Sequence, residues 1–250
     1  MKIAIISDIH GNLDALASVL QDIQQENCQK IFCLGDLAMA GPEPHETLNK
    51  IKSLIETKDF HIIQGNTDNM LSVFSLETYE AIKSVTEPMA NAYMADSKLL
   101  TEEEKDFLKN LPPQEEVTIG NINILLVHGS PRKNNENIFP NLKIEEVEEM
   151  IKDTKANIIF CGHTHMPCGY QTNTEQTVVN VGSVGRPFSE EPKACYVVMD
   201  INEKTSSYTI NHKLIEYDVE KASRKLKERG FEGADKLAQM LIKATSRYPQ

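Results

Sequence analysis

Asp, Asn and His side chains follow five apolar segments of the chain, and a glycine lies within a few residues of each group. Carboxylate, amide and imidazole groups are ligands that divalent first-row metals accept, and Asp with His favours manganese, iron, cobalt or zinc over calcium or magnesium. One such residue alone is usually a cap or a satisfied polar group, but five glycine-flanked groups together indicate a shared metal site. The seven candidate ligands are Asp8, His10, Asp36, Asn66, His128, His163 and His165.

Seven ligands are enough for two metal ions if one of them bridges, and open positions then remain for water and substrate. Two neighbouring dications repel each other unless they share an anionic ligand. Asp36 follows the middle one of the first three predicted strands, so we expect it to bridge. The other histidines are not at glycine-flanked strand ends, and we expect none of them to bind metal. They are His45, His61 and His212.

The elements that would position these ligands follow from the spacing of apolar residues. Strand-like runs at 3–6, 30–34 and 60–63 alternate with helical patterns at 13–26 and 44–57, which is typical of a sheet with parallel strands. The carboxyl ends of parallel strands meet at one edge of a sheet, so groups far apart in the sequence converge there. We therefore expect an α/β fold in which the candidate ligands line one crevice.

The rest of the chain predicts a helical insertion and a second sheet. Residues 69–111 have a polar helical pattern without any strand-like run, and we interpret them as a small helical cap inserted into a single domain that spans residues 1–250. Gly120 and Asn121 would join two strands in a tight hairpin turn. The further predicted elements are strands at 116–119, 122–127, 158–161, 177–181 and 194–200, a polar strand pair across 202–205, and helices at 144–153 and 219–244, the last interrupted at Gly230 and Gly233.

Composition excludes several classes of protein. The formal net charge of −11 repels nucleic-acid backbones and anionic lipid, so we expect no basic patch for nucleic acid. No apolar run is long enough for a membrane span or a signal-peptide core, and we expect a cytoplasmic protein with no membrane partner. The five cysteines include no C-x-x-C pair, which predicts reduced thiols and not a disulfide framework or a zinc knuckle.

Five short motifs resemble the sequence blocks of the calcineurin-like metallophosphoesterases, in the same order and with matching spacing. They are Ser7-Asp8-Ile9-His10-Gly11-Asn12, Gly35-Asp36, Gly65-Asn66-Thr67-Asp68, Val127-His128-Gly129-Ser130-Pro131-Arg132 and Gly162-His163-Thr164-His165. Residues 180–187 and 215–218 further resemble the small bacterial and archaeal phosphodiesterase branch, so the resemblance covers nearly the whole chain.

The resemblance implies a four-layer α/β/β/α sandwich with a dinuclear centre of two divalent transition-metal ions, drawn from manganese, iron, zinc, cobalt and nickel. By position, one ion would be held by Asp8, His10, Asp36 and His165, and the other by Asp36, Asn66, His128 and His163. The implied reaction is hydrolysis of a phosphoester by in-line attack of a metal-bridging hydroxide. We expect Asp36, Asn66 and His128 to be catalytic residues, and a small phosphodiester or a nucleotide to be the substrate.

One motif departs from the family pattern. Many relatives carry a histidine where Thr67 stands, and that histidine is assigned the role of protonating the leaving group. A threonine hydroxyl cannot act as a general acid near pH 7, so we expect a preference for substrates with good leaving groups. Asp68, which orients the histidine in those relatives, would then be a structural cap.

Four residues form the predicted substrate-binding set: Asn12, Asn66, Arg132 and Arg186. Both arginines follow glycine-containing turns near the expected crevice, where a guanidinium could grip a second phosphate by two hydrogen bonds. The alternative for each arginine is a surface ion pair. Met89 and Tyr93 are among the cap residues that could wall a nucleobase pocket, although such side chains on helices more often belong to the core.

Three other functions remain open at this point. A dinucleoside polyphosphate hydrolase and a serine/threonine protein phosphatase are alternatives among enzymes. A non-catalytic scaffold with the same fold is the alternative outside enzymes. Loss of catalysis usually appears as missing ligands, whereas all seven positions here keep ligand-type side chains, which favours the enzyme.

Overall fold

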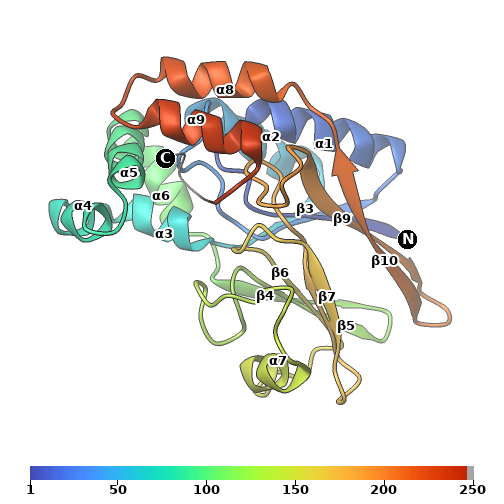
Figure 1. Ribbon diagram of the computed structural model, residues 1–250. Helices are drawn as coiled ribbons and strands as arrows, with labels where there is room; N and C mark the ends of the chain where they lie inside the picture. Colours follow the sequence, from blue (N-terminus) through green and yellow to red (C-terminus); the bar gives the residue numbers. More distant parts are fainter. Residues whose placement is uncertain (247–250) are drawn as a thin grey trace.

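Two five-stranded sheets form the centre of the computed structural model, which describes residues 1–246 (Figure 1). The first sheet consists of β1 (Lys2–Ile6), β2 (Lys30–Cys33), β3 (Asp59–Ile62), β9 (Ala194–Asn202) and β10 (Ser207–Ile215), in the order β10-β9-β1-β2-β3. The second consists of β4 (Gln114–Ile119), β5 (Ile122–Val127), β6 (Ile158–Cys161), β7 (Cys168–Gln171) and β8 (Thr177–Asn180), in the order β4-β5-β6-β8-β7. Strands β1, β2 and β3 are parallel, and so are β5, β6 and β8, so each sheet gathers several carboxyl ends at one edge.

Apolar residues on both faces explain why β1 lies at the centre of the first sheet. Ile3 and Ile5 belong to the core between the two sheets, whereas Ala4 and Ile6 belong to the core beneath the helices. Successive side chains of a strand point to opposite faces, so a strand buried on both sides must be apolar throughout. The short apolar run at the start of the chain therefore becomes a central strand.

Helices cover the outer face of each sheet, which confirms the predicted four-layer α/β/β/α sandwich. Helices α1 (Leu13–Gln25), α2 (Pro44–Thr57), α8 (Val219–Glu228) and α9 (Ala234–Lys243) share a core with the first sheet, and α7 (Ile144–Ile151) shares a core with the second. Helix α1 begins where the Asn12 side chain accepts a hydrogen bond from the Ala15 N–H. It buries Leu16, Val19 and Ile23 at helical spacing against the sheet.

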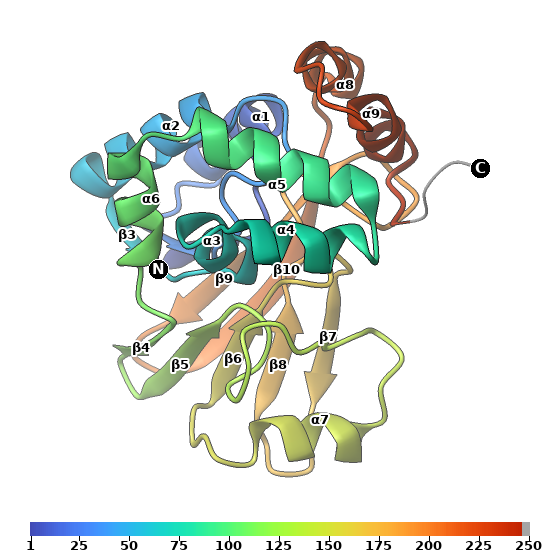
Figure 2. The ribbon, with the colours of Figure 1, turned by 90° about the vertical axis from the view of Figure 1, so that its left-hand side faces the viewer.

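The segment between β3 and β4 forms helices α3 (Asn66–Ser72), α4 (Leu76–Lys83), α5 (Glu87–Leu99) and α6 (Glu102–Lys109). Figure 2 shows these helices on the same side of the sheets as α1 and α2, opposite α7. The segment predicted as a cap over 69–111 is thus helical, and it begins slightly earlier because the Asp68 carboxylate accepts the Gly65 N–H and starts α3 there. The single domain of residues 1–250 stays a prediction, and its last four residues lie outside the described ones.

Two parts of the sheets differ from the prediction. The sequence does not predict β7, because this edge strand alternates half-buried and exposed residues and contains Gly169. The hairpin near residues 202–205 is longer than predicted, since β9 and β10 have nine residues each. All five cysteines are free, as predicted. Within residues 1–246, no helix is both long enough and apolar enough to cross a membrane.

Candidate metal centre

Five strand-end loops bring the predicted ligands to one edge of the two sheets. Asp8 and His10 follow β1, Asp36 follows β2, Asn66 follows β3, His128 follows β5, and His163 and His165 follow β6. Five of these residues form two sets whose ligand atoms all lie within 4.8 Å of one another. We call them the first group (Asp8, His10 and His165) and the second group (Asp8, Asp36 and His128).

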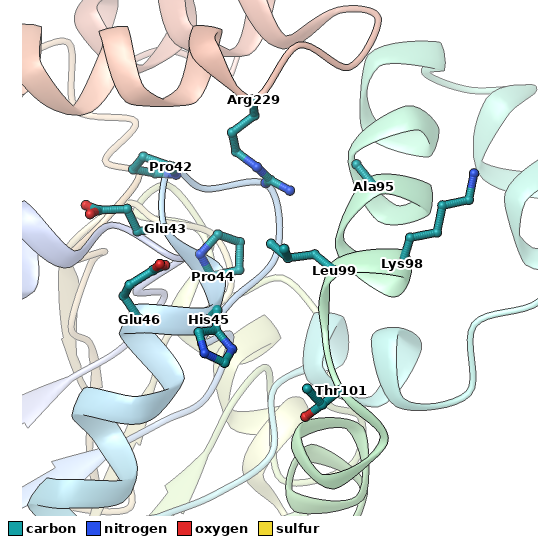
Figure 3. Close-up of a pocket in the computed structure, with 10 residues that line it drawn as sticks. All are labelled: Pro42, Glu43, Pro44, His45, Glu46, Ala95, Lys98, Leu99, Thr101 and Arg229. Atoms are coloured by element: carbon teal, nitrogen blue, oxygen red, sulfur yellow. The ribbon is translucent and has the colours of Figure 1, made fainter.

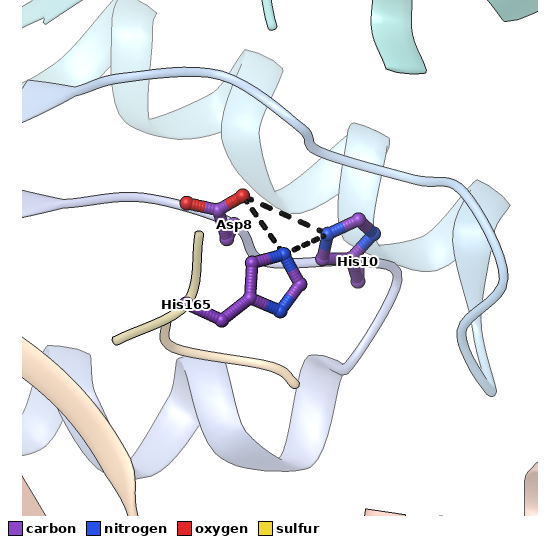
Figure 4. A group of neighbouring side chains, drawn as sticks. All are labelled: Asp8, His10 and His165. Carbon is purple, nitrogen blue, oxygen red and sulfur yellow. Dashed lines mark hydrogen bonds and ion pairs between the residues drawn. The ribbon is translucent and has the colours of Figure 1, made fainter. Parts of the chain in front are cut away.

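In the first group, both imidazoles turn a nitrogen toward the Asp8 carboxylate (Figure 4). Asp8 Oδ1 lies 3.2 Å from His165 Nε2 and 3.7 Å from His10 Nε2, and the two Nε2 atoms are 3.1 Å apart. Ligands of a tetrahedral ion with bonds of about 2.0–2.2 Å lie about 3.3–3.6 Å apart. The three measured distances lie close to this range, so the three atoms could surround one ion.

In the second group, His128 Nε2 lies 3.3 Å from Asp36 Oδ2 and 3.9 Å from Asp8 Oδ1. Asp36 Oδ2 also lies 3.7 Å from His10 Nε2, so this carboxylate faces both groups. That placement suits the bridging role predicted for Asp36. Asp8 takes part in both groups as well, whereas the family resemblance assigns it to one ion.

The two remaining predicted ligands flank the second group. Asn66 Oδ1 lies 3.0 Å from His128 Nε2. The His163 ring packs edge-on against the His128 ring with centroids 5.3 Å apart. The backbone N–H of His163 donates to Asp8 Oδ2 at 2.9 Å. Asn66 and His163 both line the cavity beside the groups, where they could complete the coordination of a second ion.

Backbone carbonyls orient three of the imidazoles. The pairs are His10 Nδ1 with Met39 O at 2.8 Å, His128 Nδ1 with Leu34 O at 2.7 Å, and His165 Nδ1 with Arg186 O at 2.6 Å. A carbonyl only accepts, so each Nδ1 carries a proton, and Nε2 is the ring nitrogen that faces the carboxylates and is available to bind a metal once it is deprotonated. Lone pairs and carboxylate oxygens at these distances repel one another unless a proton or a metal cation lies between them. The donor set therefore fits divalent metal ions.

The electrostatics of this buried site favour bound cations. Burial would raise the pKa of Asp36, but the neighbouring His128 lowers it to about 2. Burial would lower the pKa of His128, but the carboxylates of Asp36 and Asp8 raise it to about 10. Burial lowers the pKa values of His163 and His165, which keeps both rings in the neutral form that binds metal. The negative potential that would hold a proton on His128 also attracts a dication.

Five of the seven predicted ligands have a left-handed backbone conformation, which residues other than glycine rarely adopt. The φ angles are 55° for Asp8, 47° for His10, 57° for Asp36, 67° for His163 and 61° for His165. Such conformations cost about 1–3 kcal/mol each and concentrate at functional sites. The glycines beside them allow the ligand loops to touch, because a Cβ on Gly65 would overlap the Asp36 carboxylate and one on Gly162 would overlap that of Asp8.

A cavity of about 270 Å³ opens beside the two groups. Besides predicted ligands, its lining residues are Thr67, Met89, Arg186, Phe188, Met240 and Ser246. The backbone N–H of Arg186 donates to Ser183 Oγ at 2.8 Å, and the Arg186 guanidinium contacts Met89 and Phe188. Arg186 thus lies at the cavity, and its contact with substrate stays a prediction.

Two of the predicted substrate-binding residues do not line this cavity. Asn12 is fully buried, and its Nδ2 donates to Gly185 O at 2.9 Å while its Oδ1 caps α1, so it joins two loops. Arg132 forms a two-pronged ion pair with Glu136, at 2.7 and 2.8 Å. The structure therefore shows the surface ion pair for Arg132, and the substrate contact expected there is not supported.

The three other histidines lie outside the two groups. His45 pairs with Glu104, His61 pairs with Glu115, and His212 bonds to the Asn180 carbonyl. His45 also lines a larger cavity, of about 700 Å³, between the start of α2, helix α5 and Arg229 (Figure 3). None of the seven predicted ligands lines that cavity.

Sequence reasoning missed three residues at the metal-centre cavity, which are Phe188, Met240 and Ser246. The Phe188 ring stacks on the His165 ring with centroids 4.4 Å apart, and Met240 reaches the cavity from α9. The helical spacing of the tail predicts that Met240 is buried, but it carries no information about which cavity it borders. For Phe188, the one available signal is its position two residues after Arg186.

A four-layer α/β sandwich with Asp and His clusters at the carboxyl ends of its strands defines the metallophosphoesterase class of folds. The sequence model of the calcineurin-like phosphoesterase superfamily domain matches residues 1–204. The chain belongs to that superfamily.

Known proteins are similar to this chain over most of its length. The chain is 30% identical over 241 residues to an uncharacterised protein of Methanocaldococcus jannaschii, and the match covers 90% of this chain and 91% of that protein. A crystal structure of a Pyrococcus horikoshii protein is similar with a TM-score of 0.85 at 21% identity, over 97% of this chain and 98% of that one. A metallophosphoesterase from Sphaerobacter thermophilus has a TM-score of 0.75 at 24% identity, over 98% and 99%. At these identities the two structures show the shared fold.

Proposed function

We propose that this protein is a metal-dependent phosphoester hydrolase that acts on a small phosphodiester or a nucleotide. The observation that carries the proposal is the placement of the Asp36 carboxylate between two groups of metal-ligand atoms beside one cavity. Membership of the calcineurin-like phosphoesterase superfamily supports a phosphoester as the substrate class.

Two divalent ions would be held by this chain's own side chains. Asp8, His10 and His165 would hold one, Asn66, His128 and His163 would hold the other, and Asp36 would bridge. When bound, two such ions lower the pKa of water from 15.7 toward about 7 and neutralise charge on the phosphoryl oxygens. The positive charge of the ions exceeds the negative charge of Asp8 and Asp36, so phosphate is attracted locally despite the net charge of −11.

The remaining lining residues support a substrate with an aryl or nucleobase group. Met89, Phe188 and Met240 form an apolar side of the cavity, and methionine adapts to flat aromatic ligands. The planar guanidinium of Arg186 suits a second anionic oxygen or a second phosphate. A phosphodiester of an aryl alcohol or of a nucleoside would use both features.

The cavity also supports a preference for good leaving groups. Among the described residues that line it, apart from the predicted ligands, none has a side chain that titrates near pH 7. Thr67 occupies the position of the usual proton donor, and its hydroxyl cannot supply the proton. The leaving oxygen would therefore depart as an anion or take a proton from water.

A substrate panel tests the proposal. Purified protein loaded with Mn²⁺ is assayed on bis-p-nitrophenyl phosphate, p-nitrophenyl phosphate and diadenosine tetraphosphate, with Asp36→Asn as the control. We expect the diester to be hydrolysed fastest. Fastest turnover of diadenosine tetraphosphate would favour a dinucleoside polyphosphate hydrolase, and fastest turnover of the monoester would favour a phosphatase. Metal-loaded protein that hydrolyses none of the three would contradict the proposal and favour a scaffold.

A further inference from the structure

The loop between β2 and α2 supports much of the metal centre. It contains Asp36, and its Met39 carbonyl accepts the Nδ1 proton of His10 at 2.8 Å. A Cβ on Gly41 would overlap the His10 carbonyl, so the loop lies directly against the His10 backbone. Asp36 and Ala40 have φ angles of 57° and 60°, so the loop is strained at two points and other groups must hold it in place.

Asp68 holds the first half of this loop. Its Oδ2 accepts the Asp36 N–H at 2.7 Å and the Gly65 N–H at 2.9 Å, and its Oδ1 accepts the Leu37 N–H at 2.9 Å. In return, the Thr67 N–H donates to Asp36 Oδ1 at 2.8 Å. The fully buried carboxylate of Asp68, which lies on α3, therefore ties the turn after β2 to the turn after β3.

Asp96 holds the second half of the loop. This fully buried residue of α5 accepts the Ala40 N–H through Oδ2 at 2.8 Å, and its Oδ1 pairs with Arg229 Nη2 at 2.7 Å. Arg229 also donates from Nη1 to Gly41 O at 2.9 Å. Figure 3 shows the Arg229 side chain extending from the end of α8 into the space between the loop of Pro42 and helix α5. The buried ion pair thus clamps the part of the loop that supports His10.

We propose that Asp68 and Asp96 are positioning residues for the metal centre, and that the segment α3–α6 is a structural part of that centre and not a detachable lid. Asp68 acts on Asp36, which faces both groups, so its loss should affect both ions. Asp96 acts on the loop that supports His10, which belongs to the first group alone. The inference rests on the metal-binding part of the proposed function and is independent of the substrate.

Calorimetric titration of Mn²⁺ into the metal-free full-length protein tests the inference. Every partner of the two carboxylates is a donor, so the amide of Asp68→Asn or Asp96→Asn leaves at least one donor facing an NH₂ group. We expect Asp68→Asn to lower the affinity for both Mn²⁺ ions by about 10- to 100-fold. Asp96→Asn should lower the affinity for one ion by the same factor and change the affinity for the other by no more than about threefold. Asp22→Asn is the control, because the Asp22 carboxylate accepts the Tyr196 hydroxyl and pairs with Lys213, both of which lie on strands and not in a ligand-bearing loop. This variant should bind both ions as the wild type does.

Thermal unfolding of the metal-free proteins shows which variants fold. Since Asp96→Asn deprives the buried Arg229 of its anion, the double variant Asp96→Leu/Arg229→Met removes both charges together and still leaves the Ala40 N–H unpaired. This double variant should also lose affinity for one Mn²⁺ ion and keep its affinity for the other. Folded variants with wild-type affinities would overturn the inference and leave the proposed function standing, and equal weakening of both ions in the Asp96 variants would overturn the role of Asp96. A wild-type protein that binds no ion would overturn both proposals.

Discussion

The two sheets contribute different chemistry to the metal centre. The loops of the first sheet supply both carboxylates, one amide and one imidazole, whereas the loops of the second supply imidazoles alone. Each sheet nevertheless depends on the other, because the Leu34 carbonyl of the first orients His128 of the second, and Asp8 of the first accepts the His163 N–H of the second. Neither sheet carries a complete ligand set, so the site exists only where the sheets pack together.

Removal of the carboxylate that faces both groups should have the largest effect. We expect Asp36→Asn to lower kcat/KM for bis-p-nitrophenyl phosphate by at least about 10³-fold, which exceeds the roughly 10- to 100-fold loss typical of the outer partners of a ligand. His163→Asn, on the second sheet, should cost less, about 10- to 100-fold, because His163 would hold only one of the two ions and belongs to neither closely spaced group. Initial rates at saturating Mn²⁺ measure both losses. Equal losses in the two variants would contradict this ranking.

Weakening the contact between the sheets should have the next largest effect. Phe160 of β6 is fully buried in the core that both sheets share. We expect Phe160→Ala to lower the free energy of unfolding by about 3–5 kcal/mol, measured by urea unfolding. Phe139→Ala is the control, because that side chain is 36% exposed, and it should cost no more than about 1 kcal/mol. If Phe160→Ala cost no more than the control, packing between the sheets would not be what holds the site together.

Much of the fold could be predicted because its signals are local. Helix α2 spans the predicted residues 44–57, and the Gly120-Asn121 turn joins β4 and β5 as expected. Strand β7 could not be predicted, because it is an edge strand and an edge strand does not need an apolar run. Its conformation depends on pairing with β8, which the sequence of the strand itself does not encode.

The convergence of the candidate ligands could be predicted for the same reason, but the residues that support them could not. Each candidate ligand lies within three residues of a glycine after an apolar strand, a pattern that a short stretch of sequence reveals. Asp96 gives no such signal, because an aspartate within a helix usually faces solvent, and it is buried here only because Arg229 arrives from a distant part of the chain. Met240 reaches the cavity in the same way, through packing between segments far apart in the sequence.

The turn after β3 in the first sheet should determine how the rate depends on the leaving group. With Thr67 at the position of a proton donor, we expect rates for aryl phosphodiesters to fall steeply as the pKa of the leaving phenol rises. Thr67→His should raise the rate for phenyl esters by about tenfold or more and leave p-nitrophenyl esters unchanged, because only the poorer leaving group needs the proton. The rates of the wild type are measured across a series of substituted phenyl esters. Rates that do not change with the pKa of the leaving phenol would show that another group donates the proton.

Substitution of the two arginines predicted to bind substrate should have the smallest effects. Arg186 lines the cavity, whereas Arg132 pairs with Glu136 outside it. We expect Arg186→Ala to raise KM for bis-p-nitrophenyl phosphate by about tenfold, as the loss of a charge-assisted hydrogen bond would. Arg132→Ala should stay within about twofold of the wild type, because exposed ion pairs contribute little. A larger change in KM for Arg132→Ala than for Arg186→Ala would mean that the substrate occupies a different surface.

Metal content tests the central claim most directly. The full-length protein is equilibrated with Mn²⁺, freed of excess metal, and analysed by inductively coupled plasma mass spectrometry beside Asp36→Asn. If Asp36 faces two metal sites, as its distances to His10 and His128 indicate, the wild type retains two ions per chain and the variant retains at most one. A folded wild-type protein that retains no ion after equilibration would contradict the account.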